Sequence, residues 1–239
     1  MKFSWKASAI GYVIGHIIIT LWAPYGRTAP LPYKSVVQVL DAVPPTGGGT
    51  GFAVHIPGVG PGIITNSHVC QHNTNGYMYL HHPGTGTISG KKYIKVKVLK
   101  RHTLYDTCLL SGTTALKPIP LAYKSPSRGI IAYIGYPGLG KMVQSVGWIY
   151  GYGRGDVPNE NVPLADCKGK GFFIIQGLCI IRHFMVHTTA KGAPGASGSP
   201  VFTKTGKVVG MVFTVTHCSN TVDYIPVNLV RAALWGAQR

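Results

Sequence analysis

Acidic residues are scarce in this chain of 239 residues, which carries 23 lysines and arginines but only six aspartates and glutamates, for a formal net charge of +17. The six are Asp41, Asp106, Asp156, Glu160, Asp166 and Asp223. Any chemistry that depends on a carboxylate must draw on one of these positions. So large a positive charge favours anionic partners, but the signatures of nucleic-acid-binding modules are missing, and no specific nucleic-acid binding is expected.

Two further patterns are missing. Beyond the first 29 residues the sequence has no long segment of 3.6-residue periodicity and no solenoid repeat, which argues against a helical bundle and a repeat array. Short runs rich in valine and isoleucine alternate instead with turns, in keeping with 32 glycines and 17 prolines. The runs are 35–40, 51–56, 93–99, 130–135, 172–176, 182–187 and 207–215. This spacing predicts an all-β sandwich or barrel, with a short helix over 226–234.

Residues 1–29 form a separate segment, in which two lysines precede an apolar run over 7–23. The run is longer than a typical signal-peptide core and slightly short for a spanning helix, and proline follows the alanines where cleavage would occur. We expect a signal anchor, with a cleaved signal and a buried N-terminal helix as the alternatives. Basic residues before the run keep the N-terminus in the cytoplasm. A membrane-anchored or secreted domain would then lie outside the cytoplasm.

The segment from Gly192 to Pro200 reads Gly-Ala-Pro-Gly-Ala-Ser-Gly-Ser-Pro and sets Ser197 among small residues. Small neighbours allow a sharp turn that directs backbone N–H groups inward. A serine hydroxyl becomes a nucleophile only beside a base, with N–H donors placed where an oxyanion develops. The segment therefore predicts a histidine and an acid elsewhere in the chain.

His68 and Asp106 are the best candidates for these partners. His68 ends a short turn after the apolar run Gly-Ile-Ile-Thr, and Asp106 is the only acid between His68 and the middle of the chain. Apolar residues follow Asp106, as they would follow an acid at the start of a buried strand. A partly buried carboxylate that holds the imidazole Nδ1–H is what a catalytic triad requires.

The order His68, Asp106, Ser197, with the frames Thr-Asn-Ser-His-Val, Asp-x-x-Leu-Leu and Gly-Ala-Ser-Gly-Ser-Pro, resembles a chymotrypsin-fold serine peptidase. A fourth segment, Gly-Tyr-Pro-Gly-Leu-Gly at 135–140 followed by Ser-Val-Gly at 145–147, resembles that of HtrA-like and other trypsin-like peptidases. The resemblance covers about residues 34–230. It departs from the family at Ser199, where glycine is usual, and the strand after Gly210 lacks the acid-reading histidine of glutamyl endopeptidases.

The resemblance implies a peptidase domain over 30–239, built of two six-stranded antiparallel barrels at about 30–122 and 123–239. It further implies a serine endopeptidase without a cofactor that acts on proteins or peptides. A viral polyprotein-processing protease of the same fold and a catalytically inactive basic binding module stay open as alternatives.

The same resemblance assigns roles to individual residues. His68, Asp106 and Ser197 would form the triad, and the backbone N–H groups of Gly195 and Ser197 the oxyanion hole. The strand residues Val212, Phe213 and Thr214 would pair with the substrate backbone.

Thr189, Ala190 and Lys191 precede the nucleophile by six to eight residues and are expected to line the first specificity pocket. An inward Lys191 ammonium would favour an acidic residue before the cut. We prefer a solvent-directed Lys191, because lysine side chains usually reach water. Thr189 and Ala190 with Thr214 would then leave a modest apolar pocket.

The five cysteines fit an oxidising compartment. Cys167 and Cys179 bracket a short loop and are the predicted disulfide. Cys70 and Cys108 lie two residues after His68 and Asp106, respectively. We expect both to be buried as small hydrophobic residues rather than bridged, while the pairing of Cys218 stays open.

Two clusters stay outside this scheme. A basic hairpin over residues 91–101 carries Lys91, Lys92, Lys95, Lys97, Lys100 and Arg101. It is expected to be a solvated face, with anionic lipid or an acidic substrate as the functional alternatives. His68, Cys70 and His72, with His81 and His82, would supply enough ligands for zinc, but their spacing is atypical. We therefore predict no metal, and a polar surface loop for the last three histidines.

Overall fold

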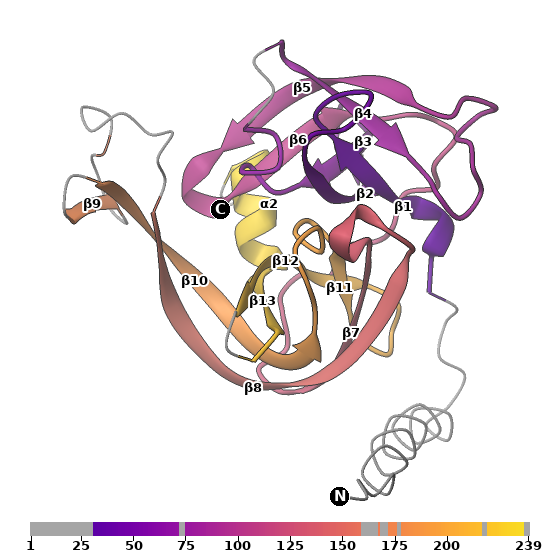
Figure 1. Cartoon of the computed structure of the whole chain (residues 1–239). Helices are drawn as coiled ribbons and strands as arrows, with labels where there is room; N and C mark the ends of the chain where they lie inside the picture. Colours follow the sequence, from indigo (N-terminus) through magenta and orange to yellow (C-terminus); the bar gives the residue numbers. More distant parts are fainter. Residues whose placement is uncertain are drawn as a thin grey trace, which may run out of the picture.

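The structure is a computed structural model that describes residues 31–71, 75–158, 167, 172–175, 178–216 and 219–236. The first half of the chain forms a closed six-stranded antiparallel barrel, here barrel 1, with strand order β1-β2-β3-β6-β5-β4 (Figure 1). Its strands are β1 (Val36–Leu40), β2 (Gly48–Ile56), β3 (Gly60–Thr65), β4 (Tyr77–His81), β5 (Ile94–His102) and β6 (Thr107–Ser111). Two 3-10 helices flank them, η1 (Tyr33–Ser35) and η2 (Thr103–Tyr105).

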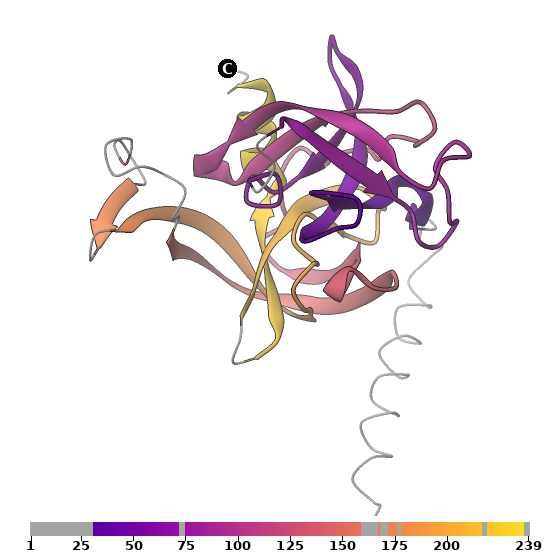
Figure 2. The same ribbon diagram turned by 45° about the horizontal axis from the view of Figure 1, so that its top comes forward.

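The second half forms barrel 2, a six-stranded sheet in the order β13-β12-β11-β7-β8-β10 that closes where β10 pairs with β13. Its strands are β7 (Gly129–Gly135), β8 (Val143–Pro158), β10 (Leu178–Lys191), β11 (Pro200–Phe202), β12 (Val208–Thr216) and β13 (Thr221–Pro226), with η3 (Pro137–Leu139) between β7 and β8. β8 and β10 run beyond the barrel as a ribbon, and β9 (Phe172–Ile175) pairs with β10 at its far end (Figures 1 and 2). The predicted pair of antiparallel barrels is confirmed.

The core explains why the strands read as continuous apolar runs rather than alternating ones. All five residues of β1 are buried. Val37 and Val39 pack inside barrel 1, whereas Val36 joins a cluster that includes Phe202 and Met211 of barrel 2. Strand side chains point alternately to opposite faces, and here both faces are covered. The two barrels thus share one apolar interface.

The predicted C-terminal helix is present as α2 (Val227–Trp235). Its residues Val230 and Leu234 are buried in the cluster between the barrels. The apolar run 7–23 lies outside the described residues. Among the helices that are described, none has the length and hydropathy to cross a membrane.

The described residues contain two disulfides. Cys167 and Cys179 form the expected disulfide. The expectation that Cys70 and Cys108 are not bridged is wrong, because they also form a disulfide. They are buried as predicted, but pairing of β3 with β6, with Thr65 opposite Cys108, brings together two cysteines 38 residues apart in sequence. Cys218 lies outside the described residues.

Candidate active site

His68 and Asp106 come from two adjacent connections of barrel 1. His68 lies in the turn that follows β3, where the N–H of Cys70 donates to the Ser67 carbonyl at 3.1 Å. Asp106 sits between η2 and β6 with φ of 40°, a left-handed conformation in which aspartate is tolerated better than most residues. Because β3 and β6 are neighbours in the sheet, the two connections lie side by side.

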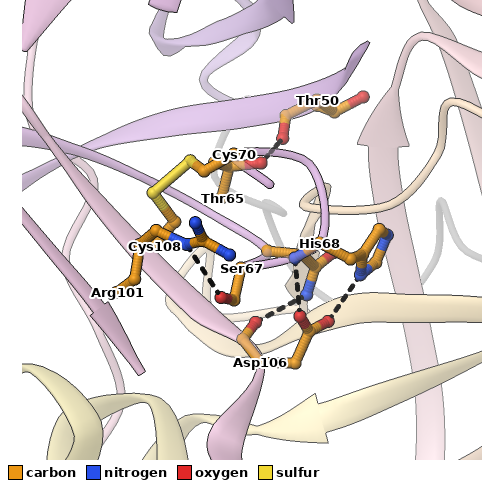
Figure 3. Close-up of a disulfide and its surroundings, with 9 residues drawn as sticks. Thr50, Thr65, Ser67, His68, Cys70, Arg101, Asp106 and Cys108 are labelled. Atoms are coloured by element: carbon orange, nitrogen blue, oxygen red, sulfur yellow. Dashed lines mark hydrogen bonds and ion pairs between the residues drawn. A yellow bond between two sulfur atoms is a disulfide. The ribbon is translucent and has the colours of Figure 1, made fainter. Parts of the chain in front are cut away.

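The Asp106 carboxylate holds His68 at two points, as Figure 3 shows. Its Oδ2 lies 2.7 Å from His68 Nδ1, and its Oδ1 accepts from the His68 backbone N–H at 2.9 Å. Burial alone would lower the pKa of His68, but the charge of Asp106 and its hydrogen bond raise that pKa above its ordinary value. With Nδ1–H donated to the buried Asp106, Nε2 is left as the basic nitrogen of the ring.

Ser197 sits in the serine loop, residues 192–200, which docks onto β2 of barrel 1. The Thr50 N–H donates to the Ser197 carbonyl at 2.8 Å, and the Thr50 hydroxyl donates to the Gly195 carbonyl at 2.9 Å. Gly198 has φ of 86°, and a Cβ there would collide with the Thr50 carbonyl oxygen. The glycine is therefore needed both for the turn and for the close approach of the two barrels.

Phe213 on β12 contacts both the serine loop and the turn that carries His68. The register of β12 against β13 shifts between Val212 and Thr214, which marks a β-bulge at Phe213. The Ser197 hydroxyl donates to the Phe213 carbonyl at 3.2 Å, and the Phe213 ring lies edge-on to the His68 imidazole with centroids 6.1 Å apart. Phe213 thus contacts both Ser197 and His68, and Asp106 joins them through its hydrogen bonds to His68. In the part of the chain that the structure describes, Ser197 and His68 share no hydrogen bond.

The N–H groups of Gly195 and Ser197 have no hydrogen-bond partner among the described residues, whereas those of Ala196 and Ser199 donate within the loop. The Pro194 carbonyl accepts a hydrogen bond from the Gly138 N–H. Because the two groups of a trans peptide point in opposite directions, the Gly195 N–H faces away from Gly138. The amides of Gly195 and Ser197 are therefore left without a partner among the described residues.

The model for a trypsin-like peptidase domain matches residues 49–211 of this chain. The chain belongs to the trypsin-like peptidase family. It is accordingly a serine endopeptidase, with proteins or peptides as substrates.

Solved peptidase structures share the fold of this peptidase. The active form of the Rv3671c protease from M. tuberculosis has a TM-score of 0.65 and 20% identity, covering 87% of this chain and 83% of that one. The serine endoprotease from Yersinia pestis has a TM-score of 0.56 and 17% identity, covering 84% of this chain and 64% of that one. The HtrA-type protease AlgW has a TM-score of 0.57 and 15% identity, covering 83% of this chain and 58% of that one. No curated protein matches the chain in sequence.

In this peptidase the predicted specificity residues lie at the end of β10. The Lys191 ammonium is exposed and donates to the Ser219 carbonyl, in the turn between β12 and β13, at 2.7 Å. Ala190 is fully buried, and the Thr189 hydroxyl accepts from the Trp148 N–H at 2.9 Å. On β12, Val212 and Phe213 are buried, while Thr214 is partly exposed.

Two residues of the site were not found by sequence reasoning. One is Thr50, described above. The other is His183 on β10, which is 5% exposed and packs on Phe213 with ring centroids 4.7 Å apart. Burial lowers the pKa of His183, and the nearby charge of His68 lowers it further, against the opposing effects of Asp106 and the Leu104 backbone. A histidine at an inward position of an apolar strand was the signal that could have revealed it.

The alternative zinc cluster is not assembled in the described residues, which hold no group of three candidate ligands. Cys70 is in a disulfide, and the ring of His81 contacts the Lys92 carbonyl. His82 is 4% exposed and accepts from the Thr85 N–H, so its prediction as a surface residue is wrong. Its ring lies edge-on to Tyr136, with centroids 6.5 Å apart, and its Nε2 lies 3.3 Å from the Tyr33 carbonyl oxygen, contacts that remove it from the surface. His72 lies outside the described residues.

Proposed function

We propose that this peptidase cleaves peptide bonds through His68, Asp106 and Ser197 by way of an acyl-enzyme. The observation that carries the proposal is the double hydrogen bond of Asp106 to His68, at 2.7 and 2.9 Å, with His68 and Ser197 both in contact with Phe213. His68 takes the Ser197 proton as Oγ attacks the scissile carbonyl, then gives it to the leaving amine. Asp106 fixes the imidazole tautomer and stabilises the imidazolium.

In this mechanism the Ser197 side chain must leave the Phe213 carbonyl. Rotation about its Cα–Cβ bond breaks one neutral hydrogen bond of 3.2 Å, which contributes only about 1 kcal/mol. Catalytic hydrogen bonds commonly tighten only when substrate is bound.

The free N–H groups of Gly195 and Ser197 are the proposed oxyanion hole. They would donate to the carbonyl oxygen of the substrate as it becomes negative. Loss of one such donor costs about 3 kcal/mol in comparable enzymes. The bulged strand at Phe213 and Thr214 would align the substrate backbone.

Labelling by a fluorophosphonate probe tests the triad. We expect the intact protein to label, and Ser197→Ala and His68→Ala not to label. Ser199→Ala is the matched control, because it removes a serine hydroxyl two residues away and should retain labelling. Labelling of Ser197→Ala would refute the nucleophile assignment, and an unlabelled intact protein would favour the inactive binding module.

For specificity we propose a small apolar residue before the cut. The hydrogen bond of Lys191 to Ser219 supports this choice, since it directs the ammonium to an exposed turn. A peptide library should then give the same preference for the intact protein and for Lys191→Ala. A preference for acidic residues that disappears in Lys191→Ala would support the inward alternative instead.

We also propose that residues 7–23 anchor the peptidase in a membrane, with the domain outside the cytoplasm. The basic hairpin would then face anionic lipid or acidic substrates. Lys91, Lys95 and Lys97 are exposed, although the Lys95 ammonium lies 4.2 Å from the centre of the Tyr77 ring. Resistance of the full chain to carbonate extraction from membranes is the expected result. Its release into the soluble fraction would contradict the anchor.

A further inference from the structure

The Cys70–Cys108 disulfide lies to one side of the proposed catalytic pair (Figure 3). Each cysteine follows His68 or Asp106 by two residues. The chain from His68 to Cys70, the disulfide, and the chain from Cys108 back to Asp106 form a short path that closes through the 2.7 Å contact of Nδ1 with Oδ2. The bridge and the hydrogen bond therefore join the same two connections of barrel 1.

The two ends of this bridge are held very differently. Cys108 belongs to β6, where it pairs with Thr65 of β3 and Arg101 of β5. Cys70 lies in a turn, and its N–H donates only to Ser67 in that same turn. The disulfide thus connects the far end of the His68 turn to the middle of a sheet.

The other bonds that hold the turn cannot take over this role. Asn66 donates to the Asp106 carbonyl at 3.1 Å, and the His68 N–H donates to the Asp106 carboxylate. Both bonds end on Asp106, which itself has a left-handed φ of 40°. The remaining polar contact to the sheet, Arg101 to the Ser67 hydroxyl, is long at 3.5 Å. Val69 of the same turn is buried and packs in barrel 1. The polar bonds just described run from the turn mainly to Asp106, so the disulfide is the covalent link that ties the turn to β6 independently of Asp106.

We propose that the Cys70–Cys108 disulfide is a positioning element for catalysis, which keeps the His68 imidazole aligned on Asp106. This inference rests on the proposed roles of those two residues. Both cysteines are buried, at 1% and 0% exposure, and act through His68. A misplacement of about 1 Å in an active site can lower the rate about 100-fold.

The test compares two pairs of substitutions in the full chain. Cys70→Ala/Cys108→Ala removes the bridge beside His68. Cys167→Ala/Cys179→Ala is the matched control, since it removes the bridge at the β9–β10 end of the ribbon. The readout is the rate of fluorophosphonate labelling of Ser197 as a function of pH, at a temperature where circular dichroism shows each protein to be folded. Alkylation and mass spectrometry first establish that both bridges are present in the intact protein.

We expect the Cys70/Cys108 variant to label about 10- to 100-fold more slowly. The midpoint of its pH profile should move down towards the ordinary value for histidine, because a loosened Asp106 no longer raises the pKa of His68. The control should keep the wild-type midpoint. A merely structural bridge would lower the unfolding temperature and leave this midpoint in place.

Wild-type rate and midpoint in the folded Cys70/Cys108 variant would overturn the inference while the triad stands. An intact protein that does not label would overturn the triad and this inference together. Should the alanine pair fail to fold, Cys70→Val/Cys108→Ala fills more of the space, and the same comparison applies.

Discussion

The buried hydroxyl of Thr50, in barrel 1, donates to the carbonyl of Gly195, in the serine loop of barrel 2, at 2.9 Å. The hydroxyl oxygen of Thr50 also accepts a hydrogen bond from the Tyr136 N–H at 3.0 Å. Thr50 thereby fixes the loop that carries Ser197 against the barrel that carries His68 and Asp106. We therefore expect the relative position of the three proposed triad residues to depend on this one side chain as well as on apolar packing.

Thr50→Val keeps the branched shape of the side chain but leaves the Gly195 carbonyl and the Tyr136 N–H without that partner. Each unsatisfied buried group costs about 1–3 kcal/mol. We expect a loss of about 2 kcal/mol in the free energy of unfolding, with slower fluorophosphonate labelling even in the folded fraction. Thr114→Val, at an exposed turn after β6 where the hydroxyl has no hydrogen-bond partner among the described residues, is the control and should change neither. Wild-type labelling by Thr50→Val would show that apolar packing alone sets the loop.

The contact of His68 with Asp106 predicts the pH dependence of activity. Since the pKa of His68 is raised above its ordinary 6.5, the labelling rate should rise with pH through a midpoint above that value. Asp106→Asn removes the charge, so the midpoint should fall, and the rate at neutral pH should fall about 10⁴-fold, as in other triads. A wild-type midpoint at or below 6.5 would contradict this prediction.

The same shift affects stability. A histidine whose pKa is raised on folding stabilises the folded state below its unfolded pKa. That contribution is lost as the pH rises through the folded value. Loss of stability on the alkaline side should therefore be smaller in His68→Ala than in the intact protein. Urea titrations across the pH range measure this difference.

Local patterns were sufficient to predict an all-β fold, the triad candidates and one disulfide, whereas the two barrels were predicted from the resemblance to trypsin-like peptidases. The Cys70–Cys108 bridge could not be found in this way. Residue alternation shows that both cysteines are buried, but only the register of Thr65 opposite Cys108 shows that they meet. The pairing of strands that are far apart in sequence cannot be predicted from the pattern of any short segment.

Thr50 escaped prediction for a related reason. The predicted run begins at residue 51, whereas β2 begins at Gly48. A Cβ on Gly49 would lie 2.8 Å from the Ser197 carbonyl oxygen. Gly49 is therefore needed for contact with the other barrel, whereas a Cβ on Gly48 would collide with the Val39 carbonyl oxygen of β1 in the same barrel. The role of Gly49 becomes visible only when both barrels are assembled.

His183 predicts a sensitivity of folding to acid. Its pKa is lowered on folding, chiefly by burial, so the folded state binds fewer protons than the unfolded chain, and stability falls as the pH drops below about 6.5. Asp106 and His68 also act on this pKa through their charges, so a variant is needed to isolate the share of His183. His183→Gln should reduce the loss of stability between about pH 7 and pH 5.

The measurement is the free energy of unfolding in urea at the two pH values. His55→Gln, at an exposed position of β2, is the matched control and should keep the wild-type difference. An equal loss of stability in His183→Gln and the intact protein would assign the acid sensitivity to other groups.

Ser199 stands where related peptidases usually have glycine, and the structure shows what accommodates it. The side chain is fully buried and packs against Gly135, where a Cβ would collide with the Ser199 hydroxyl. That hydroxyl has no hydrogen-bond partner among the described residues. Burying an unpaired hydroxyl costs about 1–3 kcal/mol. Ser199→Ala should therefore raise the free energy of unfolding by about 1 kcal/mol.

Gly135→Ala should lower that free energy by about 1–3 kcal/mol, because it overpacks the same site. The two positions are in contact, so their effects should not add. In a Ser199→Gly background, Gly135→Ala should lower the free energy of unfolding by less, because the Ser199 Oγ and Cβ atoms nearest to the new methyl group are absent. Equal costs in the two backgrounds would mean that the contact with Ser199 does not limit Gly135. Urea unfolding of the four proteins in this cycle gives the coupling directly.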